Sequence, residues 1–291
     1  MQHFQNHISF ASTGGLSGGS ARAAGHWQLD DIAFDQIQHE AIADNEDLFY
    51  LLMSASFVET GSDTYAANLA EHYSDYPEIA GWLRERWEAE ELQHGAALRR
   101  YVEAVWPQFS WQQAYDSFFG EYSKLCTVEE LNADRHLEMV ARCVVETGTT
   151  AYYHTLREMS DEPVLRQLLG HIRNDEVNHF KHFLKYFKQL QEQSPVSRTR
   201  IAGALYARLK ELRESDSDVA LRHVFAHRGR YFADSGRQFA DIAQRVYQLV
   251  STQLPADLAV RMLLKPLLLP QRLESCLYSP ISKFATRLMA A

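Results

Sequence analysis

The sequence is organised around residues 173–179, which read Arg-Asn-Asp-Glu-Val-Asn-His. Within this stretch Glu176 and His179 are three residues apart, and Asp175 directly precedes the glutamate. Residues i and i+3 of an α-helix share a face, so both side chains can reach one common ligand. A carboxylate and an imidazole together suit a first-row metal ion such as iron, manganese or zinc. Taken alone, one Glu-x-x-His pair is equally well explained as a solvated helix face.

A second Glu-x-x-His pair, Glu91 and His94, favours a metal site over a solvated helix face. Each pair follows a lone glutamate on an apolar stripe of helical period: Glu59 precedes Glu91 by 32 residues, and Glu146 precedes Glu176 by 30. Two helices giving one Glu each and two giving Glu-x-x-His form the ligand set of a di-iron or di-manganese site in a four-helix bundle. The sequence therefore predicts an all-α fold with a dinuclear centre whose ligands are Glu59, Glu91, His94, Glu146, Glu176 and His179.

The chemistry of these ligands narrows the choice of metal. Four carboxylates with two imidazoles favour iron over a zinc site built on thiolates. We therefore expect two iron ions, with manganese as the alternative. A carboxylate such as Glu59 in the middle of an apolar stripe costs several kcal/mol to bury unless it is paired or bound to metal.

A histidine that binds metal through one ring nitrogen needs an acceptor for the other. Asp175 and Glu90 each precede a ligand glutamate, at equivalent places in the two half-repeats. We expect Asp175 to contact His94 and Glu90 to contact His179. A plain surface charge is the alternative interpretation of Glu90.

Four helices are expected to carry the ligands, and no segment shows the alternation typical of a β-strand. A short helix is expected before them over residues 30–43, and an aromatic segment at 109–122 is expected to form one or two helices across the end of the bundle. Further helices are expected at 197–214, 218–252 and 256–265, followed by a leucine-rich tail. The ligand helices are predicted at residues 44–73, 77–107, 127–159 and 163–194.

Composition divides the 291-residue chain into three parts. Residues 1–26 are rich in Gly and Ser and are predicted to be a flexible arm. Residues 27–194 should form the bundle, and residues 195–291 a basic helical extension. Residues 1–194 hold 14 Lys+Arg and 30 Asp+Glu, a net charge of −16, whereas residues 195–291 hold 15 and 8, a net charge of +7. The basic part is expected to face an acidic partner, a membrane surface or the bundle itself.

Localisation is predicted from absences in the sequence. The three cysteines form no Cys-x-x-Cys motif, which is typical of a reducing compartment. No secretory signal is visible, and no run of about 18 apolar residues lacks a charge or proline. We therefore expect a cytoplasmic protein without a transmembrane segment.

Residues 45–190 resemble one family within the ferritin-like superfamily, the soluble acyl-acyl-carrier-protein desaturases. Residues 87–95 read Trp-Glu-Ala-Glu-Glu-Leu-Gln-His-Gly, similar to the Trp-x-Ala-Glu-Glu-x-x-His-Gly stretch of that family. Residues 175–179 are similar to its Asp-Glu-x-x-His motif. Glu59 followed by Thr64-Tyr65 resembles its first ligand helix, and Glu146 with Thr149 resembles its lone glutamate and neighbouring threonine. The N-terminal arm and residues 195–291 match no part of the family.

This resemblance implies a ferritin-like di-iron oxidase or oxygenase that uses O₂ and external electrons. It implies a catalytic role in oxygen activation for Thr149, although close helix packing also explains a threonine there. The implied partners are a hydrophobic small molecule or an acyl-carrier-bound substrate, an electron donor such as a ferredoxin, and a second copy of the chain in a homodimer.

Other functions remain open from the sequence. Ferritin- or rubrerythrin-like proteins that oxidise iron or remove peroxide share the ligand set, but this chain lacks a rubredoxin-like Cys-x-x-Cys pair. A helical protein that binds a partner or a membrane surface, with a structural metal site, is a further alternative. Nucleic-acid binding is not expected, because the basic residues lack the aromatic interleaving of single-strand binders.

Overall fold

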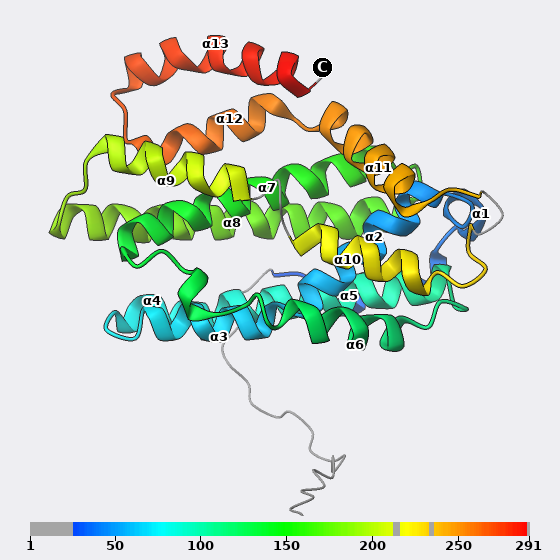
Figure 1. The fold of residues 1–291 in the computed structure, drawn as a ribbon. Coiled ribbons are helices and arrows are strands. Elements are labelled where there is room, and N and C mark those ends of the chain that lie inside the picture. Colours follow the sequence, from blue (N-terminus) through cyan, green and yellow to red (C-terminus); the bar gives the residue numbers. More distant parts are fainter. Residues whose placement is uncertain (1–25, 212–215, 233–235, 290–291) are drawn as a thin grey trace, which may run out of the picture.

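Helices make up the regular structure of this chain. The computed structural model describes residues 26–211, 216–232 and 236–289, and within these ranges there is no β-strand. Figure 1 shows the helices stacked in layers, most of them with nearly parallel axes. The predicted all-α class is confirmed for the described residues. The predicted flexible arm lies outside them, except for His26.

The predicted ligand residues lie on four helices, and these pack in two close pairs. Helix α7 lies along α8, and α2 lies along α5 (Figure 1). Contacts between the two pairs join residues more than 80 positions apart, such as His94 and Asp175. The four helices are α2 (Glu46–Thr60), α5 (Glu88–Val105), α7 (Arg135–Glu158) and α8 (Pro163–Gln193).

The start of α8 is fixed by its N-cap. Glu162 is fully buried, and its carboxylate accepts hydrogen bonds from the backbone N–H groups of Val164 at 3.1 Å and Leu165 at 2.7 Å. Proline at the first helical position suits this cap, because its missing N–H would have no partner there. The cap fixes the residue at which α8 begins, and Glu176 and His179 further along this helix face residues of α5.

The apolar core is divided into two clusters, and the predicted ligands lie at their junction. Trp87, directly before α5, and Leu98 within α5 belong to different clusters, and the first Glu-x-x-His pair falls between them. Along α8, Ile172 and Phe183 belong to different clusters, with the second pair between them. Apolar packing above and below therefore shields the polar layer from water.

Two of the expected ligand helices are irregular. The helix expected at 44–73 is broken at Gly61, and α3 (Ser62–His72) follows. The glycine brings the chain against α6, since a Cβ there would lie 3.3 Å from the ring of Tyr122. The helix expected from residue 77 comprises α4 (Pro77–Trp82), a π-helical turn (Leu83–Trp87) and α5. Such turns are often found next to functional sites.

Elsewhere the N-terminal half is less helical than expected. The segment expected to be one helix at 30–43 contains two 3-10 turns and the short helix α1, and the helix expected at 127–159 begins only at residue 135. Asp134 provides the cap at that point by accepting a hydrogen bond from the backbone of His136 at 3.0 Å. The elements concerned are the 3-10 turns Leu29–Asp31, Phe34–Gln36 and Val128–Glu130, with α1 (His39–Ile42). The aromatic segment at 109–122 forms one helix, α6 (Trp111–Tyr122), as expected.

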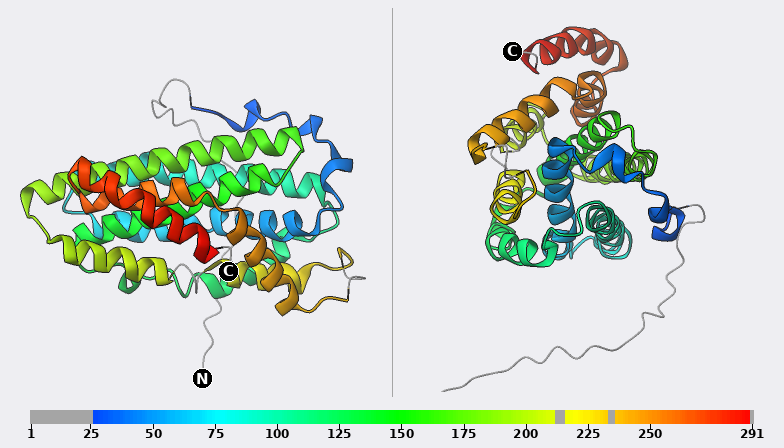
Figure 2. Two further views of the ribbon diagram at one scale, coloured as in Figure 1. Left: turned by 90° about the horizontal axis from the view of Figure 1, so that it is seen from above. Right: turned by 90° about the vertical axis from the view of Figure 1, so that its right-hand side faces the viewer.

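The last third of the chain packs on the ligand helices. Helix α10 lies against α2 and α6, while α9 and α12 lie against α7. The helix expected at 218–252 is split into α10 and α11. Helix α13, which was not expected, runs along α12 on the outside (Figure 2). The bounds are α9 (Arg198–Glu211), α10 (Asp216–His227), α11 (Phe239–Gln253), α12 (Ala256–Leu264), a 3-10 turn (Lys265–Leu267) and α13 (Gln271–Met289).

Several basic residues of this last third form ion pairs with the acidic part of the chain. Arg222 contacts Glu121 at 3.0 Å, and Arg200 contacts Asp134 at 2.7 Å. Arg245 contacts Glu46 at 2.8 Å. For these arginines the bundle itself is the acidic partner. None of the described helices is both long and apolar enough to cross a membrane.

Candidate metal centre

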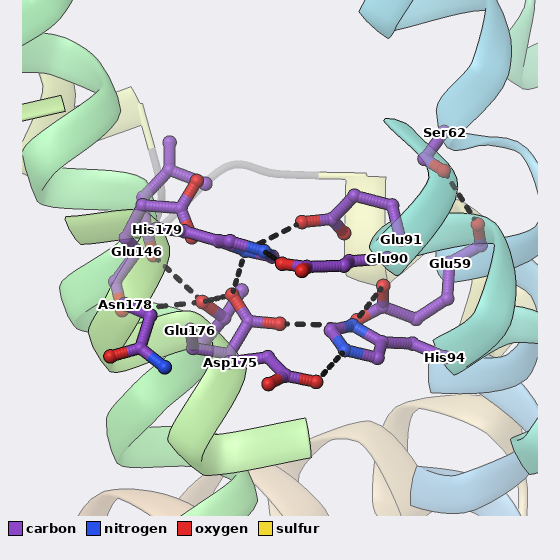
Figure 3. A network of polar contacts seen from close by, with 12 residues as sticks. Glu59, Ser62, Glu90, Glu91, His94, Glu146, Asp175, Glu176, Asn178 and His179 are labelled. Atoms are coloured by element: carbon purple, nitrogen blue, oxygen red, sulfur yellow. Dashed lines mark hydrogen bonds and ion pairs between the residues drawn. The ribbon is translucent and has the colours of Figure 1, made fainter. Parts of the chain in front are cut away.

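The six predicted ligand side chains meet in two overlapping groups. Glu59, His94, Glu91 and Glu176 form one group, and Glu91, Glu146, Glu176 and His179 form the other. Within each group the nitrogen and oxygen atoms that could bind an ion lie within 4.8 Å of one another. Glu91 and Glu176 belong to both groups, as the centre of Figure 3 shows. The least buried of the six, Glu91, is 7% exposed.

The two histidines direct the same ring atom into the cluster. His94 Nδ1 lies 3.4 Å from Glu176 Oε1 and 3.8 Å from Glu59 Oε2. His179 Nδ1 lies 3.1 Å from Glu91 Oε1 and 3.7 Å from Glu146 Oε2. Each histidine is one turn after its glutamate on the same helix, so the two side chains of a pair project together. The two pairs approach each other from opposite sides (Figure 3).

The opposite nitrogen of each histidine meets an acid from the other pair's helix. His94 Nε2 is 3.1 Å from Asp175 Oδ2, and His179 Nε2 is 2.8 Å from Glu90 Oε2. Both contacts are the ones that the half-repeat predicts. Glu90 is itself held by Arg86, whose Nε donates to it at 3.0 Å. A carboxylate at Nε2 fixes the ring orientation and leaves Nδ1 to act as a ligand.

Three buried atoms in the centre have no hydrogen-bond partner, namely His94 Nδ1, His179 Nδ1 and Glu176 Oε1. Buried polar atoms are almost always hydrogen-bonded, so each exception requires an explanation. All three are atoms that can donate a lone pair to a cation, and each faces other carboxylates. The donor set of carboxylate oxygens and imidazole nitrogens fits iron or manganese. The residues present therefore fit a pair of divalent cations.

The electrostatics of the cluster show how much negative charge it concentrates. Burial, with the neighbouring carboxylates Glu176 and Glu59, raises the pKa of Glu91 well above its ordinary value. Burial likewise raises the pKa of Glu146 to about 8. Burial would also raise the pKa of Glu176, but the close imidazoles of His179 and His94 hold it well below the usual range. Without cations, the cluster is tolerable only when protons neutralise part of its charge.

Thr149, the predicted catalytic residue, lies beside the cluster. Its Oγ1 donates to Glu176 Oε2 at 2.8 Å, and the side chain is half-buried. The structure thus brings Thr149 together with a predicted ligand, while its part in catalysis stays a prediction. Tyr153, one turn further along α7, donates a short hydrogen bond from its hydroxyl to Glu59.

Sequence reasoning predicted no contact with a candidate ligand or its acid for three residues that make one: Tyr153, Trp27 and His26. Trp27 Nε1 donates to Asp175 Oδ2 at 2.6 Å, and His26 Nε2 lies 3.1 Å from Asp175 Oδ1. Tyr153 is on the inner stripe of its helix, so a buried hydroxyl in need of a partner was a usable signal. Trp27 directly follows a Gly- and Ser-rich arm without periodicity, and nothing in that pattern pointed to α8.

A cavity of about 310 Å³ adjoins the cluster. Glu59, Thr149 and Tyr153 line it on the side of the candidate ligands, and residues of α10 and α11 line it on the outside. Most of the remaining lining is aliphatic. The candidate ligands therefore border a mostly apolar pocket on this side.

Comparison with known proteins gives no relative from which a function could be carried over: no protein-family model matches the sequence, and no curated protein matches it.

Proposed function

We propose that this chain is a ferritin-like protein that binds two divalent metal ions, iron or manganese, and oxidises an apolar organic substrate with O₂. The metal ligands would be Glu59, Glu91, His94, Glu146, Glu176 and His179. The observation that carries the proposal is the pair of overlapping buried groups, supplied by four helices, whose inward nitrogen atoms have no other partner. Apolar side chains pack above and below these buried carboxylates, so only cations or protons can compensate their negative charge.

The chemistry would be divided between the metal and the chain. A bound pair of iron ions supplies redox reactivity toward O₂, with electrons from an external donor such as a ferredoxin. Asp175 and Glu90 hold the two imidazoles in orientation. The Oγ1 hydroxyl of Thr149 donates a hydrogen bond to Glu176, and Thr149 lies between the proposed ligands and the cavity. The aliphatic lining of the cavity excludes water from the place where a substrate would lie.

The cavity favours substrate oxidation over iron storage. An iron-storing protein needs a polar route for hydrated cations, whereas the space next to Glu59 and Thr149 is lined mostly by aliphatic side chains. A transferable metal ion would gain no ligands there. An organic molecule, by contrast, would replace water against apolar surface.

Metal binding is tested by anaerobic titration of the metal-depleted full chain with Fe²⁺, followed by calorimetry and metal analysis. We expect about two ions per chain, as for dinuclear carboxylate centres. Glu59→Ala and Glu146→Ala each remove a ligand from one group and should leave one tightly bound ion. Glu176→Ala affects both groups and should abolish tight binding. Glu103→Gln, an exposed change on α5, is the control.

Two outcomes would overturn different parts of the proposal. Weak, non-saturating binding that Glu176→Ala does not alter would remove the metal centre. Saturable binding of Fe²⁺ without O₂ consumption, when the loaded protein is given a chemical reductant, would keep the centre but remove the oxidase.

A further inference from the structure

Among the described buried side chains that line the cavity beside the metal centre, one has a hydroxyl without a hydrogen-bond partner. Ser54 on α2 lines the cavity and is 6% exposed, yet its hydroxyl has no hydrogen-bond partner. A buried hydroxyl without a partner costs roughly 1–3 kcal/mol. Because native structures contain few such groups, the cavity is expected to hold a molecule that satisfies this one.

The neighbours of Ser54 show why it lacks a partner. Serine and threonine in helices usually donate to the carbonyl three or four residues earlier. Ser56 on the same helix does so, donating to Met53 O at 2.7 Å. The corresponding carbonyl for Ser54 is that of Leu51, which already accepts the hydroxyl of Tyr152 at 3.0 Å. Tyr152 thus competes with Ser54 for this acceptor, and Ser54, which lines the cavity, is left without a partner.

The lining also limits the charge of the molecule. None of the described residues that line the cavity is a lysine, arginine or histidine, and Glu59 is acidic. An anionic head group would therefore be buried without a cation, at a cost of many kcal/mol. The polar group that meets Ser54 is accordingly neutral, such as an alcohol, ketone or ester oxygen.

The volume of the cavity and the positions of its lining residues determine the size and orientation of the molecule that it can bind. A volume of about 310 Å³ is at the small end of ligand pockets. It accommodates about ten non-hydrogen atoms, at about 30 Å³ for each water-sized group. Ser54 precedes Glu59 by five residues on one helix, an axial distance of about 7.5 Å. A molecule whose oxygen lies at Ser54 would therefore have its aliphatic end beside Glu59 and Thr149.

We propose that the cavity binds the substrate of the metal centre as a neutral aliphatic molecule of about ten non-hydrogen atoms, with one oxygen hydrogen-bonded to Ser54 and its aliphatic end toward Glu59 and Thr149. This rests on the proposed function. Helices α10 and α11 close the cavity with Leu221, Val246 and Val250. The last third of the chain therefore sets the size of the substrate.

The test compares 1-nonanol with octanoate, a probe of equal size but negative charge, by calorimetry on the full chain. Nonanol is expected to bind and octanoate to bind much more weakly. Ser54→Ala should weaken nonanol binding about threefold to tenfold, the effect of one neutral hydrogen bond. Val250→Trp should fill the cavity and abolish binding, whereas Thr252→Trp, at an exposed position of the same helix, should not.

Three results would overturn the inference. Octanoate binding as tightly as nonanol would contradict the neutral head group. Unchanged nonanol affinity in Ser54→Ala would mean that the hydroxyl meets only water. Binding that survives Val250→Trp would place the molecule elsewhere. Because these titrations do not require bound iron, a failure of the metal centre is seen separately, in the Fe²⁺ titration.

Discussion

Asp175 joins the candidate metal centre to the beginning of the described chain. Its carboxylate contacts His94, accepts the indole N–H of Trp27 and lies next to His26. Burial would raise the pKa of Asp175, but the hydrogen bonds from His94 and Trp27 and the charge of the imidazoles hold it below its usual range. The side chain therefore remains a negatively charged acceptor that fixes the orientation of the ring.

We expect Asp175→Asn to weaken binding of one cation about 10- to 100-fold, as is typical when the partner of a metal-bound histidine is changed. The amide oxygen can still accept from Trp27, so folding should be retained. Glu90→Gln should have the same effect on the other cation, through His179. Two-site Fe²⁺ binding isotherms measure both. Equal weakening by the exposed change Asp161→Asn would show that the effect is not local.

At this scale the sequence was informative where the spacing was periodic. Glu-x-x-His occurs twice, with equal internal spacing, and both pairs meet with their predicted acids. Trp27 and Ser54 could not be found in this way. The first reaches Asp175 from 148 positions away, and the second differs from Ser56 only in what surrounds it.

Among the elements, α2 and α5 come into close backbone contact at Gly95. A Cβ on this glycine would lie 2.7 Å from the backbone nitrogen of Thr60 and 2.8 Å from its Cα. Thr60 directly follows Glu59, and Gly95 directly follows His94, so this contact sets the distance between two predicted ligands. The helix pair can be this close only because the residue has no side chain.

Gly95→Ala is expected to destabilise the fold by about 1–3 kcal/mol through overpacking. It should also weaken the cation held by Glu59 and His94, because α2 and α5 must separate. Gly120→Ala in α6 is the control: nothing lies within 4 Å of its Cβ, and better helix propensity should stabilise the fold by up to about 1 kcal/mol. Urea unfolding measures both, and equal stability of the two variants would contradict the close approach.

The helix boundaries that the sequence did not predict depend on tertiary contacts. The apolar stripe continues through residues 60–62, but the chain turns at Gly61 to pack against α6. The described residues 228–232 and 236–238 are not part of an α-helix and interrupt the one expected at 218–252. Gly229 and Gly236 there have positive φ values of 58° and 67°. Periodicity shows which face is buried and not where a helix must bend.

For the whole molecule, the central cost is the concentration of acidic groups inside an apolar core. Cations that bind only the folded chain stabilise it by mass action, about 2.7 kcal/mol at a free concentration 100 times the dissociation constant. We therefore expect removal of metal by a chelator to lower the melting temperature, and Fe²⁺ or Mn²⁺ to restore it. Glu176→Ala should respond to neither treatment. Identical melting curves of the native chain with and without metal would contradict this.

The architecture as a whole was only partly predictable from the sequence. The ligand helices and the all-α class follow from period and spacing, whereas the placement of residues 195–291 depends on long-range packing. Their net positive charge was compatible with an acidic partner, a membrane surface or the bundle itself. Ion pairs such as Arg245 with Glu46 show that several basic groups face the chain's own acidic part. The role of α10 and α11 as the outer wall of the cavity had no signature in composition or period.

That wall and the ligand cluster come from separate stretches of the chain. Every candidate ligand precedes residue 180, while the outer wall begins at residue 221. Substitutions in α10 and α11 can therefore accumulate without disturbing a single candidate ligand. Descendants of this gene that keep the inner residues but vary the later helices should hold the same ions and select different molecules, so that reactivity and selectivity evolve independently.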